Sequence, residues 1–154
     1  MEGVKLVRTV RKIVPRANER SLLILDIDMT LINGQMTLVD PLTPEWIRSL
    51  LPRHDILICT YRDSAFAEYT EEQFKNLGLE AILNQNILFH PLEGLSCQVR
   101  RNIIYTQHKG KAYYEVKTSL ASLIWTDVHF IDDQALALHE MNSYNPEVQL
   151  YLIY

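Results

Sequence analysis

The chain has 154 residues, enough for one ordinary domain with a sizeable core and too few for two large ones. Its 47% hydrophobic and 22% charged residues exclude a disordered chain, a collagen-like repeat and a coiled-coil rod. A net charge of −4 argues against binding nucleic acid over the whole surface, and we expect no nucleic-acid partner. Two cysteines, Cys59 and Cys97, are too few for a disulfide framework and indicate a reducing compartment.

No apolar run is long enough to cross a bilayer, so we expect no membrane span in this chain. The first residues lack the continuous apolar segment of a secretory signal, because Arg8, Arg11 and Lys12 interrupt it. These features favour a cytoplasmic protein. The chain ends on an apolar, strand-like run, 148–153. A complete domain and the N-terminal part of a longer protein would share that ending.

Short apolar runs alternate with segments of helical periodicity, the pattern of an α/β protein with a parallel sheet. Residues 21–27 are predicted as a central strand, because their continuous apolar character suits a strand that is covered on both faces. A turn at 33–34 follows. The next helix is expected to have Thr43 as its N-cap and Pro44 as its first residue, and to end near Pro52.

Residues 55–60 form the second predicted strand, and a helix over 64–77 follows, with Gly78 in the position just past its end. The segment after that is less regular. Short strands at 87–89 and 103–105 are expected to form a hairpin or a small flap.

The last part of the chain repeats the alternation of helix and strand. A helix over 109–123 leads to the third core strand, 128–131, and a helix over 134–141 leads to the last strand, 148–153. Four core strands with helical crossovers predict a single domain over 1–154, with a doubly wound, Rossmann-like parallel sheet.

Polar side chains gather where the predicted strands end. Asp26 and Asp28 lie at the end of the first strand, Thr60 ends the second, and Asp132 and Asp133 end the third. Ligands of doubly wound sheets bind at the carboxyl ends of the strands. We therefore expect these side chains to share one edge of the sheet.

Carboxylates that lie close together repel one another unless a cation neutralises them. Oxygen donors without His or Cys at metal spacing favour Mg²⁺. Lys109 at a helix start and the Thr60 hydroxyl would complete a cradle for a phosphate group. An Asp beside the metal and the phosphate can attack phosphorus and give an aspartyl-phosphate. A second Asp two residues on can protonate the leaving oxygen and then activate water.

Residues 26–30, Asp-Ile-Asp-Met-Thr, resemble the DxDxT motif of the haloacid dehalogenase (HAD) superfamily of phosphohydrolases. The other three family motifs follow in order: Thr60 at a strand end, Lys109 before a helix, and the acidic pair 132–133. The resemblance covers roughly residues 21–140. It implies a HAD-like fold and a Mg²⁺-dependent phosphatase with an aspartyl-phosphate intermediate.

The resemblance also implies a role for each motif residue. Asp26 is expected to be the nucleophile and a metal ligand, and Asp28 the general acid/base, with its backbone carbonyl on the metal. Thr60 is expected to hydrogen-bond the transferred phosphoryl group. Lys109 is expected to neutralise the charge of the nucleophile and of the phosphate.

Asp132 is expected to complete the Mg²⁺ site, with Asp133 beside it, directly or through water. The pair can also cap the following helix, which is compatible with metal binding. Arg62 either contacts the anionic substrate or is a surface residue. Lys111 competes with Lys109 for the third motif, and the Lys-Gly step at the helix start favours Lys109.

HAD enzymes usually select their substrate with a cap inserted after the first or second motif. The segment 30–60 is filled by the turn, the helix and the second strand, and the later segment leaves only 79–107 for a small flap. The sequence thus predicts a small or absent cap and an open site, unless a partner chain supplies a lid. Open sites admit large substrates such as phosphoproteins.

Residues 59–79, 108–116 and 130–133 resemble a bacterial HAD subgroup, with Phe74 in place of the usual Leu. Some members of the wider bacterial group are secreted effectors that act on phosphotyrosine in proteins. The resemblance therefore implies, as an alternative to the cytoplasm, export to a host cell without a cleavable signal peptide. The leading hypothesis is a Mg²⁺-dependent phosphomonoester hydrolase acting on protein phosphotyrosine. The alternatives are a small-metabolite phosphatase and a catalytically inactive HAD-scaffold binding module.

Overall fold

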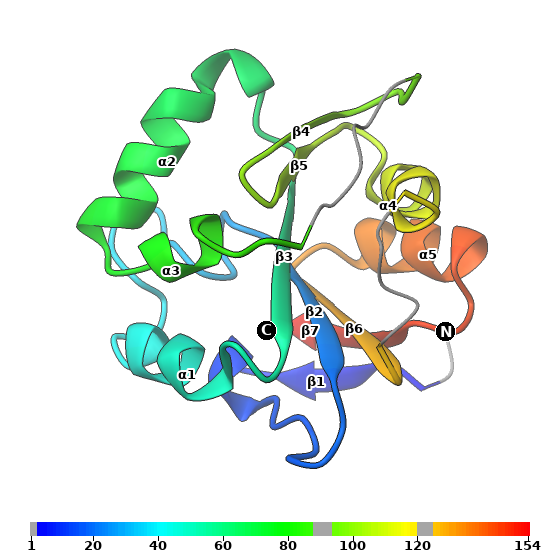
Figure 1. Cartoon of the computed structure of the whole chain (residues 1–154), viewed down its shortest axis with the longest axis horizontal. Helices are drawn as coiled ribbons and strands as arrows, with labels where there is room; N and C mark the ends of the chain where they lie inside the picture. Colours follow the sequence, from blue (N-terminus) through cyan, green and yellow to red (C-terminus); the bar gives the residue numbers. More distant parts are fainter. Residues whose placement is uncertain (1–2, 88–93, 120–124) are drawn as a thin grey trace.

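A mostly parallel sheet with helices on both faces forms the centre of the protein (Figure 1). The computed structural model describes residues 3–87, 94–119 and 125–154, and within them the sheet has seven strands in the order β1-β7-β6-β2-β3-β5-β4. All neighbours are parallel except β4 and β5. The strands are β1 (Lys5–Val7), β2 (Ser21–Leu25), β3 (Asp55–Thr60), β4 (Gln98–Arg100), β5 (Ile103–Tyr105), β6 (Asp127–Asp132) and β7 (Gln149–Ile153).

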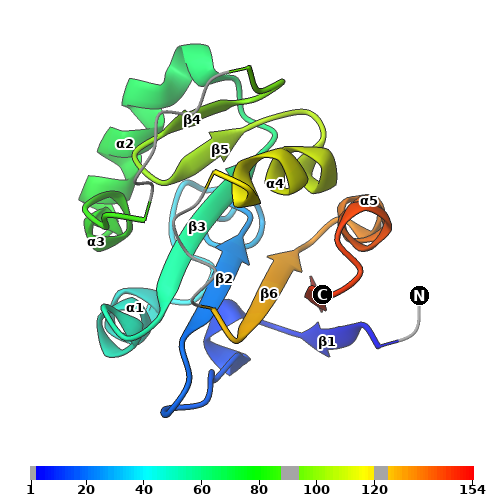
Figure 2. The same cartoon turned by 45° about the vertical axis from the view of Figure 1, so that its right-hand side comes forward.

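The helices form two layers, one on each face of the sheet (Figures 1 and 2). Among the described residues, two short 3-10 helices accompany them, η1 (Val10–Lys12) and η2 (Ser64–Phe66). The expected α/β architecture with a parallel sheet is therefore confirmed. One layer holds α1 (Thr43–Leu50), α2 (Ala67–Asn76) and α3 (Glu80–Leu83), and the other holds α4 (Lys109–Lys117) and α5 (Ala135–Tyr144).

The central strand β2 is buried along its whole length, as its continuous apolar sequence predicts. Leu23 and Leu25 pack into the apolar core beneath α1, α2 and α3, whereas Leu22 and Ile24 pack into the core beneath α4 and α5. Alternate side chains of a strand point to opposite faces, so one strand serves both cores. Each such buried side chain contributes about 2 kcal/mol to folding.

Two local predictions on the α1–α2 side have different outcomes. The predicted N-cap, Thr43, is wrong by one residue: Leu42 occupies the cap, and the Thr43 hydroxyl donates to the Asp40 carbonyl oxygen instead. The predicted helix over 64–77 is present as η2 followed by α2, and Gly78 adopts the left-handed conformation (φ +80°) expected just past a helix end.

The segment predicted as a hairpin or flap contributes to the main sheet. β5 lies beside β3, with Thr60 opposite Tyr105, so residues 103–105 are not part of a flap. The partner of β5 in the hairpin is β4, whereas the prediction gave that place to 87–89. The predicted flap segment, 79–107, also contains α3, and its residues 88–93 lie outside the described residues.

Strand β1 was not predicted. It pairs parallel with β7, with Lys5 opposite Tyr151, and forms the edge of the sheet. Helix α4 begins at the predicted Lys109, and the end of that predicted helix falls partly on 120–124, outside the described residues. In the part of the chain that the structure describes, no helix is both long and apolar enough to span a membrane.

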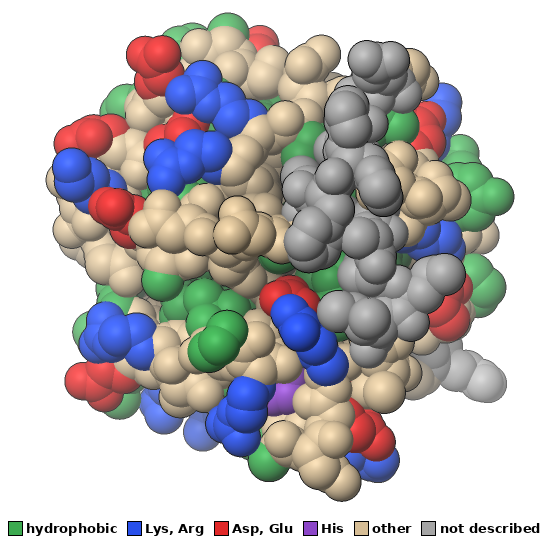
Figure 3. All heavy atoms as spheres, viewed as in Figure 1, with side chains coloured by type: hydrophobic (Ala, Val, Ile, Leu, Met, Phe, Trp, Pro, Cys, Tyr) green, Lys and Arg blue, Asp and Glu red, His purple; other side chains and the backbone are tan. Residues whose placement is uncertain are grey.

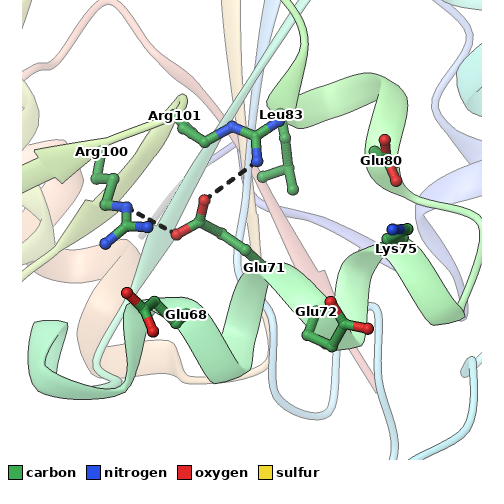
Figure 4. Close-up of a pocket in the computed structure, with 8 residues that line it drawn as sticks. All are labelled: Glu68, Glu71, Glu72, Lys75, Glu80, Leu83, Arg100 and Arg101. Atoms are coloured by element: carbon green, nitrogen blue, oxygen red, sulfur yellow. Dashed lines mark hydrogen bonds and ion pairs between the residues drawn. The ribbon is translucent and has the colours of Figure 1, made fainter.

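Ion pairs join the β4–β5 hairpin to α2 (Figure 4). Arg100 Nε lies 2.8 Å and Arg101 Nη1 3.3 Å from the carboxylate oxygens of Glu71. The Glu71 side chain is 8% exposed, whereas both arginines are about half exposed. We call Glu71, Arg100 and Arg101 the Glu71 cluster. Figure 3 shows basic and acidic side chains interspersed over this part of the surface.

Candidate active site

The carboxyl ends of the three central strands meet at one edge of the sheet. Leu25 of β2 pairs with Ile58 of β3 on one side and with Ile131 of β6 on the other. Asp26 directly follows β2, and its backbone N–H donates to the Ile131 carbonyl oxygen at 3.1 Å. Asp132 ends β6. The strand register therefore brings the two aspartates together, as the sequence predicted.

Lys109 joins these two aspartates in a buried ionic group. Its Nζ lies 2.7 Å from Asp26 Oδ1 and 2.6 Å from Asp132 Oδ2. The side chains of Lys109 and Asp132 are fully buried, and that of Asp26 is 7% exposed. Lys111 is exposed, so the structure places Lys109, the favoured of the two lysines, at the site. We call Asp26, Lys109 and Asp132 the buried triad.

Gly110 explains why the lysine can reach this position. A Cβ atom at Gly110 would lie 2.5 Å from the backbone carbonyl oxygen of Glu140, so only glycine lets α4 approach α5 this closely. Asn145 Nδ2 donates to the Gly110 carbonyl oxygen at 2.9 Å, and the Gly110 N–H donates to the Glu140 carboxylate. The Lys-Gly step noted in the sequence is thus a requirement of helix packing.

The buried triad has two carboxylates and one ammonium group, so its negative charge is not balanced. Burial raises the pKa of Asp26 to about 8, although the charge of Lys109 opposes this shift. Burial also raises the pKa of Asp132, again against the effect of Lys109. Burial alone would lower the pKa of Lys109, but the two carboxylates outweigh it and raise that pKa. Lys109 therefore stays charged, and one further cation would let both aspartates ionise.

Asp133 adds a third carboxylate beside the triad. One oxygen from each of Asp26, Asp132 and Asp133 lies within 4.8 Å of the others, a grouping that can hold a metal ion. Hard carboxylate oxygens of this kind suit Mg²⁺. The Asp28 carboxylate is not in this group, so among the four predicted metal residues the structure brings three side chains together.

The Asp28 side chain pairs with Arg62 at the surface of the same sheet edge. Arg62 Nε and Nη2 lie 2.9 and 2.8 Å from the two Asp28 oxygens, a bidentate pair, and the Asp28 side chain is 58% exposed. The far side of the guanidinium is fixed, because Nη1 donates to Gln73 Oε1 at 2.7 Å and to Thr70 Oγ1 at 3.2 Å. Arg62 is thus a largely buried side chain held by three partners, and its contact with an anionic substrate stays a prediction.

Thr60 lies buried at the end of β3, and its hydroxyl oxygen accepts a hydrogen bond from the Arg62 backbone N–H at 3.1 Å. Sequence reasoning missed two further contacts. The Thr30 hydroxyl donates to Asp26 Oδ2 at 3.1 Å, and Lys109 Nζ lies 4.3 Å from the centre of the Tyr61 ring. Thr30 closes the DxDxT motif, so its place in the motif was a usable signal. Nothing in the sequence singles out Tyr61.

Comparisons of the chain with family models, with curated proteins and with solved structures found no match.

Proposed function

We propose that this protein is a Mg²⁺-dependent phosphomonoester hydrolase of the HAD type, working through an aspartyl-phosphate on Asp26. The observation that carries the proposal is the buried triad beside Asp133, where three carboxylates face a single lysine at the carboxyl ends of β2 and β6. A site with this many carboxylates is suited to a divalent cation, and the bound cation would in turn attract a phosphate group.

The residues of the triad can share the work of phosphoryl transfer. Asp26, Asp132 and Asp133 would hold Mg²⁺, which when bound neutralises the negative charge on the phosphate oxygens. Lys109 fixes Asp26 Oδ1, and Thr30 fixes Oδ2, so the carboxylate is oriented before substrate binds.

The chemistry balances in two steps. In the first, an Asp26 oxygen forms a bond to phosphorus, the bond from phosphorus to the ester oxygen breaks, and Asp28 gives that oxygen a proton. In the second, Asp28 takes a proton from water, the water oxygen bonds to phosphorus, and the Asp26–phosphorus bond breaks. Asp28 must leave Arg62 to act in this way, and its exposed position allows the movement.

The proposed substrate is an exposed phosphomonoester, with phosphotyrosine in proteins as the leading class. The support is the absence of any cap between β2 and β3, where the chain forms only loops and α1. A small-metabolite phosphatase and an inactive binding module remain the competing proposals. The buried triad argues against the inactive module, because it retains the proposed nucleophile, Asp26, together with Lys109 and Asp132.

The test is hydrolysis of a generic aryl phosphate with and without Mg²⁺ by wild type, Asp26→Asn and, as a control, Glu71→Gln. We expect Mg²⁺-dependent turnover that Asp26→Asn lowers by at least about 1,000-fold and Glu71→Gln leaves intact. Full activity of Asp26→Asn would refute the mechanism.

A panel of phosphopeptides, sugar phosphates and nucleotides then separates the two enzymatic proposals. Preference for phosphopeptides supports a protein phosphatase, and preference for sugar phosphates or nucleotides supports the metabolite enzyme. Absence of hydrolysis across the whole panel would favour the binding module.

A further inference from the structure

A hollow of about 530 Å³ opens next to the Asp28–Arg62 pair. Its volume falls in the range of sites that bind small molecules. Four polar or charged residues, Asp28, Arg62, Asp63 and Thr70, form the polar end of its lining. The apolar part of the lining is made by Met36, Phe66 and Tyr69. We call it the apolar hollow.

The three apolar side chains around the hollow are unusually exposed. Met36 is 57%, Phe66 63% and Tyr69 56% exposed. A single exposed apolar residue needs no explanation. Here, however, three large ones come from the loop after β2, from η2 and from α2, and they face one concave site. Exposed apolar groups gathered in this way indicate a binding surface.

Met36 is held at the rim of the hollow by a loop that side-chain hydrogen bonds fix. Its backbone is left-handed, with φ at +65°, a conformation that disfavours a residue with a long side chain. Asn33 Oδ1 accepts hydrogen bonds from the backbone N–H groups of Gln35 and Thr37, at 2.9 and 3.0 Å, which fixes the turn. Gln73 Nε2 lies 3.4 Å from the Met36 sulfur. The fold thus keeps a thioether at the rim where Gly or Asn would fit the backbone more easily.

The hollow is continuous with the proposed catalytic site. Asp28, the proposed acid that protonates the leaving oxygen, forms part of its wall, as does Arg62. The group bonded to that oxygen must therefore lie beside Asp28. Thr70 and Gln73 hold Arg62 in place, so the polar end of the hollow keeps its shape.

We propose that the apolar hollow binds the leaving group of the substrate, and that this group is flat and apolar, as in an aryl phosphate. The inference depends on the proposed phosphatase function and adds the residues that select the substrate. A sugar or polyol would leave Met36, Phe66 and Tyr69 in contact with hydroxyl groups, and burying apolar surface would then favour it little.

The test compares kcat/KM for phenyl phosphate and for glycerol phosphate in wild type, Phe66→Ala and Tyr69→Ala. Leu136→Ala is the matched control, because Leu136 is 82% exposed on α5, at the other layer of helices. We expect wild type to prefer phenyl phosphate at least about tenfold. Each hollow variant is expected to lose about tenfold in kcat/KM on phenyl phosphate, chiefly through KM, and to keep its activity on glycerol phosphate. Equal losses on both substrates, or no loss, would overturn the inference.

Binding of phenylphosphonate, which cannot be hydrolysed at an ester bond, separates this inference from the proposed function. Weaker binding to Phe66→Ala than to wild type and Leu136→Ala supports the hollow even when wild type hydrolyses neither ester, and the proposed function alone then fails. Equal binding to all three proteins refutes the hollow, whatever the turnover.

Discussion

The buried triad and the Glu71 cluster are both groups of three ionisable side chains with unequal numbers of acids and bases. They differ in the sign of the unmatched group and in its exposure to solvent. The Glu71 cluster has one carboxylate and two guanidinium groups, and its surplus charge lies on arginines that are about half exposed. The triad has two carboxylates and one ammonium group, all at most 7% exposed. Water screens the charge of the exposed arginines well, whereas it screens charges on the buried triad much less.

The Glu71 cluster and the buried triad therefore have different roles. The first stabilises the contact between two elements, and the second is suited to binding a ligand. The Glu71 cluster joins the β4–β5 hairpin to α2 and needs nothing further. The triad has one carboxylate more than its lysine can balance, and burial raises the pKa of Asp26, so both aspartates ionise only when a further cation is present. The stability of the fold does not require this second buried carboxylate, so we attribute it to the binding of a cation, which would in turn bind a phosphate group.

Removing the triad's only cation should have the largest effect on stability. Lys109→Met leaves two buried carboxylates without a cationic partner and should lower the free energy of unfolding by about 3–5 kcal/mol. Lys111→Met, two residues on and exposed, should change it by less than about 0.5 kcal/mol. Urea denaturation of the three proteins measures both values. Similar losses in the two variants would mean that the triad is not a special site.

A change in the close packing of α4 against α5 at Gly110 should have the next largest effect on the free energy of unfolding. Gly110→Ala places a methyl group against the Glu140 backbone and should cost about 2–3 kcal/mol. Gly34→Ala is the control, since a Cβ there meets no atom within 4 Å. The first variant should also lower phosphatase activity by displacing Lys109, whereas Gly34→Ala should not. A stable and fully active Gly110→Ala protein would contradict the packing argument.

A divalent cation should stabilise the folded protein by binding at the buried triad and Asp133, and not at the Glu71 cluster. At about 10 times its Kd, Mg²⁺ should raise the free energy of unfolding by about 1.4 kcal/mol. Asp132→Asn should remove most of this increment, and Glu71→Gln should retain it. Thermal unfolding with Mg²⁺ and with a chelator measures the difference. Equal stabilisation of all three proteins would place the cation elsewhere.

His54 is a buried polar residue that is neutral in the folded protein, unlike the charged members of the triad and of the Glu71 cluster. His54 is 1% exposed, and its Nδ1 accepts the Ser21 backbone N–H at 3.1 Å, which requires the neutral ring. Burial lowers the pKa of His54 in the folded protein, so the unfolded chain takes up the proton first as pH falls. Stability is therefore complete above the ordinary histidine pKa, near 6.5, and about 0.5–1.5 kcal/mol is lost below it.

Unfolding curves from pH 8 to 5 on wild type and His54→Gln test this sign. The variant should lose less stability than wild type across that range. His139→Gln, a change at an exposed histidine, should follow wild type. A steeper acid loss in His54→Gln would contradict the assignment.

The sequence predicted the triad because its members stand at strand ends and at a helix start. Continuous apolar runs before Asp26 and Asp132 placed both residues, and parallel strands then brought them together. Lys109 was separable from Lys111 by the following glycine, although the reason, close approach to α5, needs coordinates.

Other features had no local signal. The Asp28–Arg62 pair joins residues 34 positions apart, and no pattern in the sequence specifies such a contact. Strand β1 has only three residues, and its burial does not alternate, so periodicity could not reveal it. The role of β5 as a sheet strand depends on its register with β3, a tertiary property that overrides the reading of that segment as a flap.

Trapping of the covalent intermediate tests the central claim most directly. Wild type, Asp26→Asn and Glu71→Gln would be mixed with a radiolabelled aryl phosphate and Mg²⁺, quenched in acid, and mapped for labelled peptides. We expect a hydroxylamine-sensitive label on Asp26 in wild type and Glu71→Gln, lost when Mg²⁺ is chelated and absent from Asp26→Asn. Hydrolysis by wild type with the label on another residue, or turnover by Asp26→Asn at the wild-type rate, would contradict it.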